Sequence, residues 1–568
     1  MCGVQANKVV VRVKRLGGGF GGKESRSVQL SSILALAAKK TRRPVRCMLT
    51  REEDMVTSGQ RHPFLGRWKV GVNKDGKIQA LDVDIYNNGG WSWDLSSAVC
   101  ERAMSHVDGC YYIPNVYVRG RICKTNTVSN TAFRGFGGPQ GMFIAETYMS
   151  EVADRLGMPV EKFREINFYQ RGQLTHFNQS IVDWHVPLMW EQVQKEADYA
   201  ARREAVDKFN ATHKWRKRGL ALIPTKFGIS FTALWFNQAG ALVHIYQDGS
   251  VLVAHGGTEM GQGLHTKMTM IAAQALGVPM EDVYISETAT NTVANTSPTA
   301  ASASSDLNGY AIYNACAQLN ERLAPYRAKL GPNASMKDIA HAAYHDRVNL
   351  SAQGFYKTPE IGYDWTKNEG EMFFYFTQGV AAAEVEVDTL TGSSTCLRAD
   401  IKMDVGRSIN PAIDYGQIQG AFVQGMGLFT MEESLWLRQG PMKGNLFTRG
   451  PGAYKIPGFR DIPQEWNVTL LKGVEWQELR TIQRSRGVGE PPLFLGSAVF
   501  FAIRDALKAA RKEFGVEAEV GVDREDGGLL RLVSPATAER IRLACKDPIV
   551  ERARVVPKEG EEGFFIAI

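Results

Sequence analysis

The sequence of 568 residues lacks several features that point to common classes of protein. Its eight cysteines are scattered, and no two are spaced as C-x-x-C, which argues against a zinc ribbon or an iron–sulfur cluster held by this chain. No apolar run approaches bilayer length, and the N-terminus has no charged-then-apolar leader pattern. These absences predict a cytoplasmic protein with reduced thiols and no membrane partner.

A strong charge of one sign is also absent. The formal net charge is +7, from 67 basic and 60 acidic residues, and the densest basic run is Lys214–Arg218. Such a run is more typical of a solvated loop than of a nucleic-acid site, so no nucleic-acid partner is expected. The chain also has no short-period repeat, and its 44% of hydrophobic residues is ample for large buried cores.

Hydrophobic periodicity predicts an α+β (mixed α/β) fold of two similar elongated lobes that face one cleft. The first series of expected elements comprises strands at 9–13, 45–49, 66–72 and 78–86 and helices at 28–40 and 141–156. A second series starts near Gly219 and repeats the order strand, glycine-rich loop, helix. Because the polar segment 169–186 separates the two series, we place the lobes at residues 1–172 and 173–568.

The first glycine-rich segment is Leu16–Glu24, L-G-G-G-F-G-G-K-E. Gly17 to Lys23 fit the phosphate-loop spacing G-x-x-x-x-G-K, but Glu24 stands where such a loop needs a hydroxyl for magnesium. Its carboxylate would repel phosphates, which disfavours a nucleotide-hydrolysing protein. The glycines instead indicate close approach of the backbone to a bulky ligand, with Phe20 as a wall.

Two further glycine-rich segments precede helices: Thr131–Gly141, with Arg134 and Phe136, and Thr258–Gly263. A guanidinium beside an exposed ring suits a flat, anionic or heteroaromatic ligand. The alternative is an ordinary turn with a surface arginine. If all three loops open helices at one cleft, three positive helix ends converge on one anion.

A single carboxylate, Glu490, stands in the segment Gly487–Leu495, G-V-G-E-P-P-L-F-L. It lies between a flexible turn and Pro491–Pro492, which suit a helix entry, and an apolar helical pattern follows. A carboxyl in apolar surroundings is one way in which a general base is tuned. Taken alone, the segment is better explained by a helix-capping glutamate.

Together, these segments resemble the molybdopterin domain of the xanthine dehydrogenase/oxidase family. The resemblance runs from about Val9 to about Cys545 through five motifs in the family's order: G-G-G-F-G-G-K-E, A-F-R-G-F-G-G-P-Q-G, G-G-T-E-M-G-Q-G, S-P-T-A-A-S-A-S and V-G-E-P-P. It implies that the cleft binds a molybdenum–molybdopterin cofactor and that Glu490 is the catalytic base of a metal-assisted hydroxylation. The positions that match the surroundings of the metal are Phe20, Arg134 and Ala301. The positions that match cofactor contacts are Gly21, Met260, Gly261, Gln262, Thr299, Ala300, Ser302, Ser304 and Gln417.

The resemblance also implies the substrate. Glu24 and Arg102 match the charged pair that grips opposite edges of the purine in xanthine enzymes. Phe136 and Phe231 match the two rings that sandwich it, and Thr232 matches a nearby hydroxyl contact. Hypoxanthine and xanthine are therefore the expected substrates, oxidised to uric acid with water as the oxygen source. The alternative within enzymes is an aldehyde oxidase, which typically lacks this Glu/Arg pair.

The resemblance covers one part of the family's length. Family members carry 2Fe–2S and FAD domains before the molybdenum half and pass electrons through them to NAD. Neither domain is present here, so we expect an N-terminally truncated chain. A homodimer is expected in the full-length enzyme, because the family's dimer contacts lie largely in this half. The alternative from a different class is a non-catalytic remnant that only dimerises.

Overall fold

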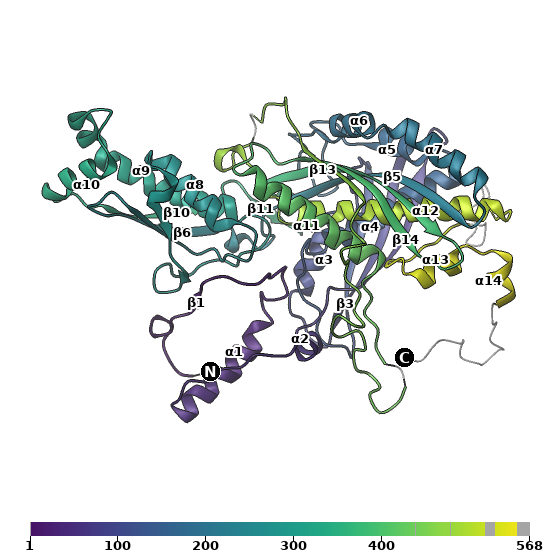
Figure 1. Ribbon diagram of the computed structural model, residues 1–568, viewed down its shortest axis with the longest axis horizontal. Helices are drawn as coiled ribbons and strands as arrows, with labels where there is room; N and C mark the ends of the chain where they lie inside the picture. Colours follow the sequence, from purple (N-terminus) through teal and green to yellow (C-terminus); the bar gives the residue numbers. More distant parts are fainter. Residues whose placement is uncertain (1, 438, 477–478, 517–528, 554–568) are drawn as a thin grey trace.

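The computed structural model describes residues 2–437, 439–476, 479–516 and 529–553. Helices and strands alternate along the chain (Figure 1). The α-helices are α1 (Ser27–Thr41), α2 (Arg51–Thr57), α3 (Ser96–Met104), α4 (Gly138–Leu156), α5 (Val160–Asn167), α6 (Val186–Glu196), α7 (Tyr199–Thr212), α8 (Leu264–Leu276), α9 (Ser304–Leu330), α10 (Met336–His345), α11 (Pro411–Thr430), α12 (Ser497–Glu513), α13 (Ala538–Ala544) and α14 (Pro548–Ala553). The 3-10 helices are η1 (Ala6–Lys8), η2 (Leu234–Phe236), η3 (Met280–Asp282), η4 (Ile482–Arg484) and η5 (Pro491–Gly496). The strands are β1 (Arg12–Val13), β2 (Phe64–Val72), β3 (Ile78–Gly90), β4 (Asn115–Lys124), β5 (Arg216–Ile229), β6 (Gln238–Ile245), β7 (Val251–His255), β8 (Val283–Ile285), β9 (Thr288–Ala289), β10 (Ser351–Lys357), β11 (Gly362–Asp364), β12 (Glu369–Glu371), β13 (Tyr375–Asp388), β14 (Ser394–Asp404) and β15 (Glu465–Leu470).

Three sheets form the framework of the molecule. In the sheet β15-β14-β13-β5, β13 pairs antiparallel with β5 and β14, and β14 pairs parallel with β15. The sheet β10-β6-β7-β8 lies with α8, α9 and α10 at the left of Figure 1. The third sheet, β2-β3-β4, packs against α3 and α4. Two short pairs, β1-β9 and β11-β12, complete the pairing of the described strands.

The strand β5 shows how one sheet serves two cores. Ala221 and Ile223 belong to the core that includes α8, α9, α11 and α12, whereas Leu220 and Leu222 belong to the core of β3, α4 and α6. Successive side chains of a strand point to opposite faces, so both faces of β5 are apolar. The central sheet therefore joins the two cores. The predicted lobe boundary at residue 172 stays a prediction.

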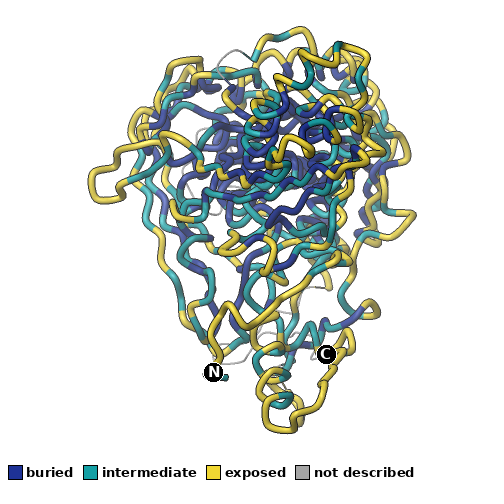
Figure 2. Tube along the Cα trace, turned by 90° about the vertical axis from the view of Figure 1, so that its left-hand side faces the viewer, coloured by how far each residue is buried: buried dark blue, intermediate teal, exposed yellow. Residues whose placement is uncertain are grey.

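The N-terminal segment, residues 2–58, differs from the rest of the described chain because none of its residues is buried. Figure 2 shows the N-terminus at the lower end of the molecule, outside the buried body. The prediction of a strand at residues 45–49 is wrong, since this exposed segment has no neighbouring strand to pair with. The strand expected at residues 9–13 forms only as β1, which pairs with β9. Among the described helices, none is long and apolar enough to cross a membrane.

Candidate functional site

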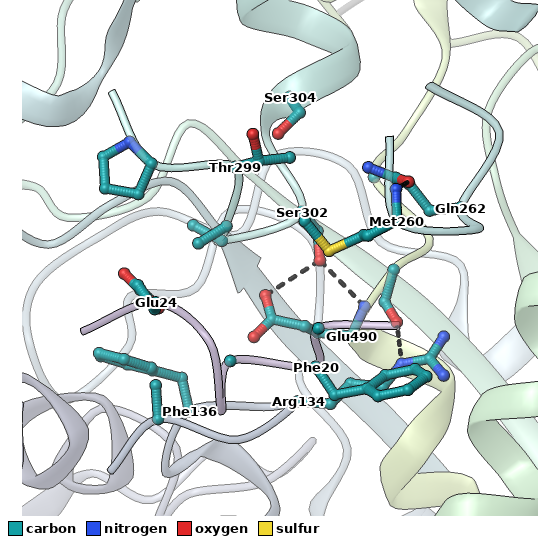
Figure 3. Close-up of a pocket in the computed structure, with 18 of the residues that line it drawn as sticks. Phe20, Glu24, Arg134, Phe136, Met260, Gln262, Thr299, Ser302, Ser304 and Glu490 are labelled. Carbon is teal, nitrogen blue, oxygen red and sulfur yellow. Dashed lines mark hydrogen bonds between the residues drawn. The ribbon is translucent and has the colours of Figure 1, made fainter. Parts of the chain in front are cut away.

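One cavity of about 780 Å³ is lined by every residue that the sequence assigned to the site (Figure 3). Its walls come from segments that lie far apart in the sequence, at residues 16–24, 95–102, 132–136, 231–236, 258–267, 298–305, 416–424 and 486–490. The assigned residues on the wall are Phe20, Gly21, Glu24, Arg102, Arg134, Phe136, Phe231, Thr232, Met260, Gly261, Gln262, Thr299, Ala300, Ala301, Ser302, Ser304, Gln417 and Glu490.

Glu490 immediately precedes η5 and is half-buried. Its Oε1 accepts a hydrogen bond from the main-chain nitrogen of Gly135 at 3.0 Å, and its Oε2 accepts one from Ser302 Oγ at 3.0 Å. The main-chain nitrogen of Glu490 donates to the same Ser302 Oγ at 2.9 Å (Figure 3). The side chain makes no capping hydrogen bond to η5, so the helix-capping interpretation is wrong. The carboxylate instead lies at the cavity, held by two other loops.

Arg134 ties three parts of the wall together. Its Nε donates to the carbonyl of Gly489, Nη1 donates to Gln424 Oε1 at 3.1 Å, and Nη2 donates to Gln417 Oε1 at 3.1 Å. Its main-chain nitrogen donates to the carbonyl of Phe20 at 2.8 Å. Burial lowers the pKa of Arg134 to about 10, against the opposing effect of the Glu490 carboxylate. The guanidinium is thus a cation on the wall at neutral pH.

Glu24 is a second carboxyl group of the cavity. Partial burial at the cavity removes water from the carboxyl group and raises its pKa to about 7, and the negative charges of Glu490 and Asp94 act in the same direction. Asp94, which the motifs did not reveal, accepts a hydrogen bond from Ser25 Oγ at 2.7 Å. Near neutral pH both forms of Glu24 are populated, so the group can donate to a ligand as well as accept from it.

Arg102 lies on α3, is only 2% exposed and uses its terminal nitrogens within the protein. Nη1 donates to the carbonyl of Gly228 at 2.7 Å and Nη2 donates to that of Ser230 at 2.6 Å. Its guanidinium carbon lies 5.2 Å from the ring centre of Phe227 and 5.1 Å from that of Phe373. The Nε is buried and has no hydrogen-bond partner among the described residues. Arg102 therefore anchors the end of β5 as well as lining the cavity.

The end of β5 leads into the aromatic part of the wall. Asn237 binds both main-chain polar groups of Phe231. Its Oδ1 accepts a hydrogen bond from the main-chain nitrogen of Phe231 at 2.9 Å, and its Nδ2 donates one to the carbonyl of Phe231 at 2.9 Å. Phe136 has a left-handed backbone with φ 48°. Such a conformation is unusual for an aromatic residue and persists only where the surroundings impose it. The main chain of Phe231 is therefore fixed by hydrogen bonds, and that of Phe136 by its surroundings.

The loop before α8 corrects one expectation. The carboxylate of Glu259 accepts hydrogen bonds from the main-chain nitrogens of Gly261 at 2.8 Å, Gly263 at 3.1 Å and His265 at 3.0 Å. The positive end of α8 is thus already matched by an anion of the chain itself. The expectation that three free helix N-termini converge on one anionic ligand is therefore wrong for α8. Gln262 also bonds within the loop, since its Oε1 accepts from the nitrogen of Met260 at 2.7 Å.

Three glycines keep part of the cavity open. A Cβ atom placed on Gly261, Gly416 or Gly420 would have no other atom within 4 Å. Gly416 and Gly420 lie one turn apart in α11, where glycine is less favourable than alanine by roughly 1 kcal/mol. Missing side chains at such positions leave room for a large ligand.

Comparisons with known proteins agree with this geometry. Residues 1–168 and residues 192–463 each match a family described as molybdopterin cofactor-binding domain. A xanthine dehydrogenase of Emericella nidulans is 72% identical over 566 residues, which is 100% of this chain and 40% of that protein. This chain belongs to the xanthine dehydrogenase/oxidase family. It spans about 40% of the length of the curated relatives it matches, and its matched part is the family's molybdopterin-binding part.

Two further comparisons concern one curated relative and one solved structure. A nicotinate hydroxylase of the same organism is 59% identical over 100% of this chain and 40% of that protein. The structure of the aldehyde oxidoreductase from Desulfovibrio gigas has a TM-score of 0.81 and 25% sequence identity, and the match covers 96% of this chain and 56% of that one. This chain therefore shares its mixed helix-and-strand fold with the corresponding part of that aldehyde oxidoreductase.

Proposed function

We propose that this chain is the molybdenum-cofactor part of a xanthine dehydrogenase-type hydroxylase that oxidises hypoxanthine and xanthine to uric acid. The observation that carries the proposal is the cavity itself, which is lined by Glu490 and Glu24 together with Phe136 and Phe231. One oriented carboxylate, one partly protonated carboxyl and two rings suit a flat, nitrogen-rich heterocycle.

The residues present fit a molybdenum–molybdopterin cofactor. The space kept by Gly261, Gly416 and Gly420 suits a bulky group, and the charged Arg134 suits an anionic one. The side chains that would hold it are those of Met260, Gln262, Thr299, Ser304 and Gln417, with Phe20, Arg134 and Ala301 around the metal. When bound, the group supplies an activated oxygen derived from water and accepts the two electrons of the oxidation.

Glu490 is proposed to remove a proton at the start of the reaction. Gly135 and Ser302 each donate to one of its carboxylate oxygens, so each oxygen keeps a lone pair for an incoming proton. Because these donors come from a main-chain nitrogen and from a loop packed on the turn, the carboxylate is oriented before substrate arrives.

Glu24 and the rings are proposed to bind the substrate. In its protonated form Glu24 donates a hydrogen bond to a ring nitrogen or carbonyl of the purine, and in its ionised form it accepts one. Direct contact between Arg102 and the purine would involve its buried Nε or a rearrangement of its terminal nitrogens, which donate to Gly228 and Ser230. In either case Arg102 fixes the strand end that leads to Phe231 and Thr232.

The electron acceptors, the compartment and the oligomeric state of the complete enzyme are proposed from the family resemblance. Electrons are proposed to leave through 2Fe–2S and FAD groups toward NAD, and the complete enzyme is proposed to be a cytoplasmic homodimer. All eight cysteines of this chain are free thiols, which is consistent with a reducing compartment.

The test uses the molybdenum-loaded protein with an artificial electron acceptor. Hypoxanthine, xanthine, nicotinate and a small aldehyde are compared by kcat/KM, and the product is formed in ¹⁸O-labelled water. We expect the highest kcat/KM for xanthine or hypoxanthine, with one labelled oxygen incorporated in each two-electron oxidation, which is one from xanthine to uric acid and two from hypoxanthine to uric acid. Preference for nicotinate or for the aldehyde would reassign the substrate. Absence of turnover by a fully loaded protein would favour the non-catalytic remnant.

A further inference from the structure

Ser302 occupies a position that its backbone does not favour. Its φ is 55° and that of the preceding Ala301 is 56°, so two consecutive residues with side chains adopt the left-handed region. A residue with a side chain is disfavoured in this region, because its Cβ approaches the following carbonyl oxygen. A strained pair persists where surrounding contacts impose it, and at Ser302 those contacts lead to Glu490.

The hydroxyl of Ser302 has a defined direction. The main-chain nitrogen of Glu490 lies 2.9 Å from Ser302 Oγ and can only donate, so the hydroxyl oxygen accepts there. Its one hydrogen is then free to donate to Glu490 Oε2, which lies 3.0 Å away. A single side chain thus holds both the backbone and the carboxylate of Glu490 (Figure 3).

The turn before Glu490 is shaped to receive this serine. A Cβ atom at Gly487 would lie 2.4 Å from the carbonyl oxygen of Ser302, and one at Gly489 would lie 3.1 Å from its Oγ. Tyr375 and Thr377 hold Gly487 from the other side, since Tyr375 OH accepts from its nitrogen at 2.8 Å and Thr377 Oγ1 donates to its carbonyl at 2.8 Å. The two glycines of the V-G-E motif therefore allow the loop of Ser302 to pack directly on the turn.

We propose that Ser302 is the positioning residue of Glu490, and that its hydroxyl sets the orientation of the proton-accepting carboxylate. The proposal rests on the proposed function of Glu490 as the base. Without the hydroxyl, Oε2 loses a charge-assisted hydrogen bond and the carboxylate turns away from its productive orientation. The loss falls on kcat, because Ser302 acts through Glu490 and not through the substrate.

The experiment compares Ser302→Gly and Ser302→Ala with the matched control Ser250→Ala in the molybdenum-loaded protein. Ser250 does not line the cavity, but its hydroxyl also donates to a carboxylate, Asp248 Oδ1, at 2.7 Å. Glycine tolerates φ 55° without strain, so Ser302→Gly removes the hydroxyl but relaxes the backbone. We expect both Ser302 variants to lose kcat by about 10- to 100-fold, with KM within about twofold and molybdenum content unchanged. Ser250→Ala is expected to keep kcat within about twofold.

A double variant tests whether Ser302 acts through Glu490. Adding Ser302→Gly to Glu490→Gln is expected to cause no further loss of kcat, because the carboxylate to be positioned is already gone. Additive losses would overturn the proposal, and so would a loss of molybdenum or a rise in KM with kcat per molybdenum unchanged. Those outcomes leave the proposed function intact. Full activity of Glu490→Gln alone would instead refute the proposed base.

Discussion

The two sides of the cavity are built on different supports. The turn at 486–490 leads into η5 and α12, where every residue from Pro491 to Ile503 is buried. The loop at 16–24 belongs to the segment 2–58, in which no residue is buried. Local opening is easiest where few apolar contacts must be broken. The comparison indicates that Glu490, the proposed proton acceptor, stands on a well-packed part of the chain, which we call the rigid body. Glu24, the proposed substrate contact, stands on a segment with no buried residues of its own.

The largest expected effect lies on the rigid side. Glu490→Gln keeps the shape of the side chain and can still accept from Gly135, but an amide cannot take a proton. We expect turnover of xanthine to fall by about 100-fold or more in the loaded enzyme. Molybdenum content and melting temperature are expected to stay unchanged, which is measured by elemental analysis and calorimetry. Near-normal purine oxidation would remove Glu490 from its proposed role.

A smaller effect is expected for Arg102→Met, which tests how the aromatic wall is supported. The variant loses the bonds to the carbonyls of Gly228 and Ser230 and leaves them buried, so the strand end that leads to Phe231 loosens. We expect kcat/KM for xanthine to fall by about 10- to 100-fold. A small aldehyde, which does not need both rings, should lose less. Equal losses on both substrates would show that the arginine serves only the fold.

The sequence indicated which residues line the cavity better than it indicated the hydrogen bonds that these residues make. Every assigned residue lines the cavity. The glycine-rich and V-G-E segments are recognisable from residue identity, whereas Arg102, Phe231, Thr232 and Gln417 were assigned only through the family resemblance. The sequence did not reveal Asn237 or Gln424, since single amides in ordinary segments carry no local signal. Glu259 stood inside the T-E-M-G-Q-G motif, and a carboxylate just before a helix could have been predicted to cap it.

The fold was predictable where elements are long and amphipathic. The predicted apolar face of α12 is confirmed, with Val499, Phe500, Ile503 and Leu507 all buried. The prediction of a strand at residues 45–49 failed because a strand needs a neighbouring strand to pair with, and the local sequence pattern does not show whether one is present. Arg102 shows the same limit, since its carbonyl partners lie more than a hundred residues away in the sequence.

Substitution of one glycine by alanine on each side of the cavity compares the two supports directly. A Cβ at Gly487 would lie 2.4 Å from a backbone oxygen of Ser302, whereas one at Gly17 would meet no atom within 4 Å. We expect Gly487→Ala to destabilise the fold by about 1–3 kcal/mol, seen in denaturant unfolding. Gly17→Ala should leave the free energy of unfolding within about 0.5 kcal/mol. Similar losses in both variants would contradict the difference between the two sides.

The smallest expected effect is a change in the pH dependence of the melting temperature, which differs between the two sides of the cavity. Asp306 lies in the rigid body, where it accepts from Tyr375 OH at 2.7 Å, and burial raises its pKa to about 7. Because its folded pKa exceeds its unfolded value, the stability that it contributes is complete below the unfolded pKa of 3.8 and is lost as pH rises through about 7. Asp306→Asn should therefore flatten the fall in melting temperature between about pH 4 and about pH 7.

Glu24 also has a raised pKa of about 7, so its linkage has the same sign. It lies in the segment 2–58, however, which we expect to open without unfolding the rigid body, because none of its residues is buried. Glu24→Gln is therefore expected to change the pH dependence of hydrogen exchange at residues 16–24, while the pH dependence of the melting temperature stays close to that of the unmodified protein. If Glu24→Gln flattens the melting profile as much as Asp306→Asn, the loop at 16–24 unfolds together with the body, and the two sides of the cavity form one cooperative unit.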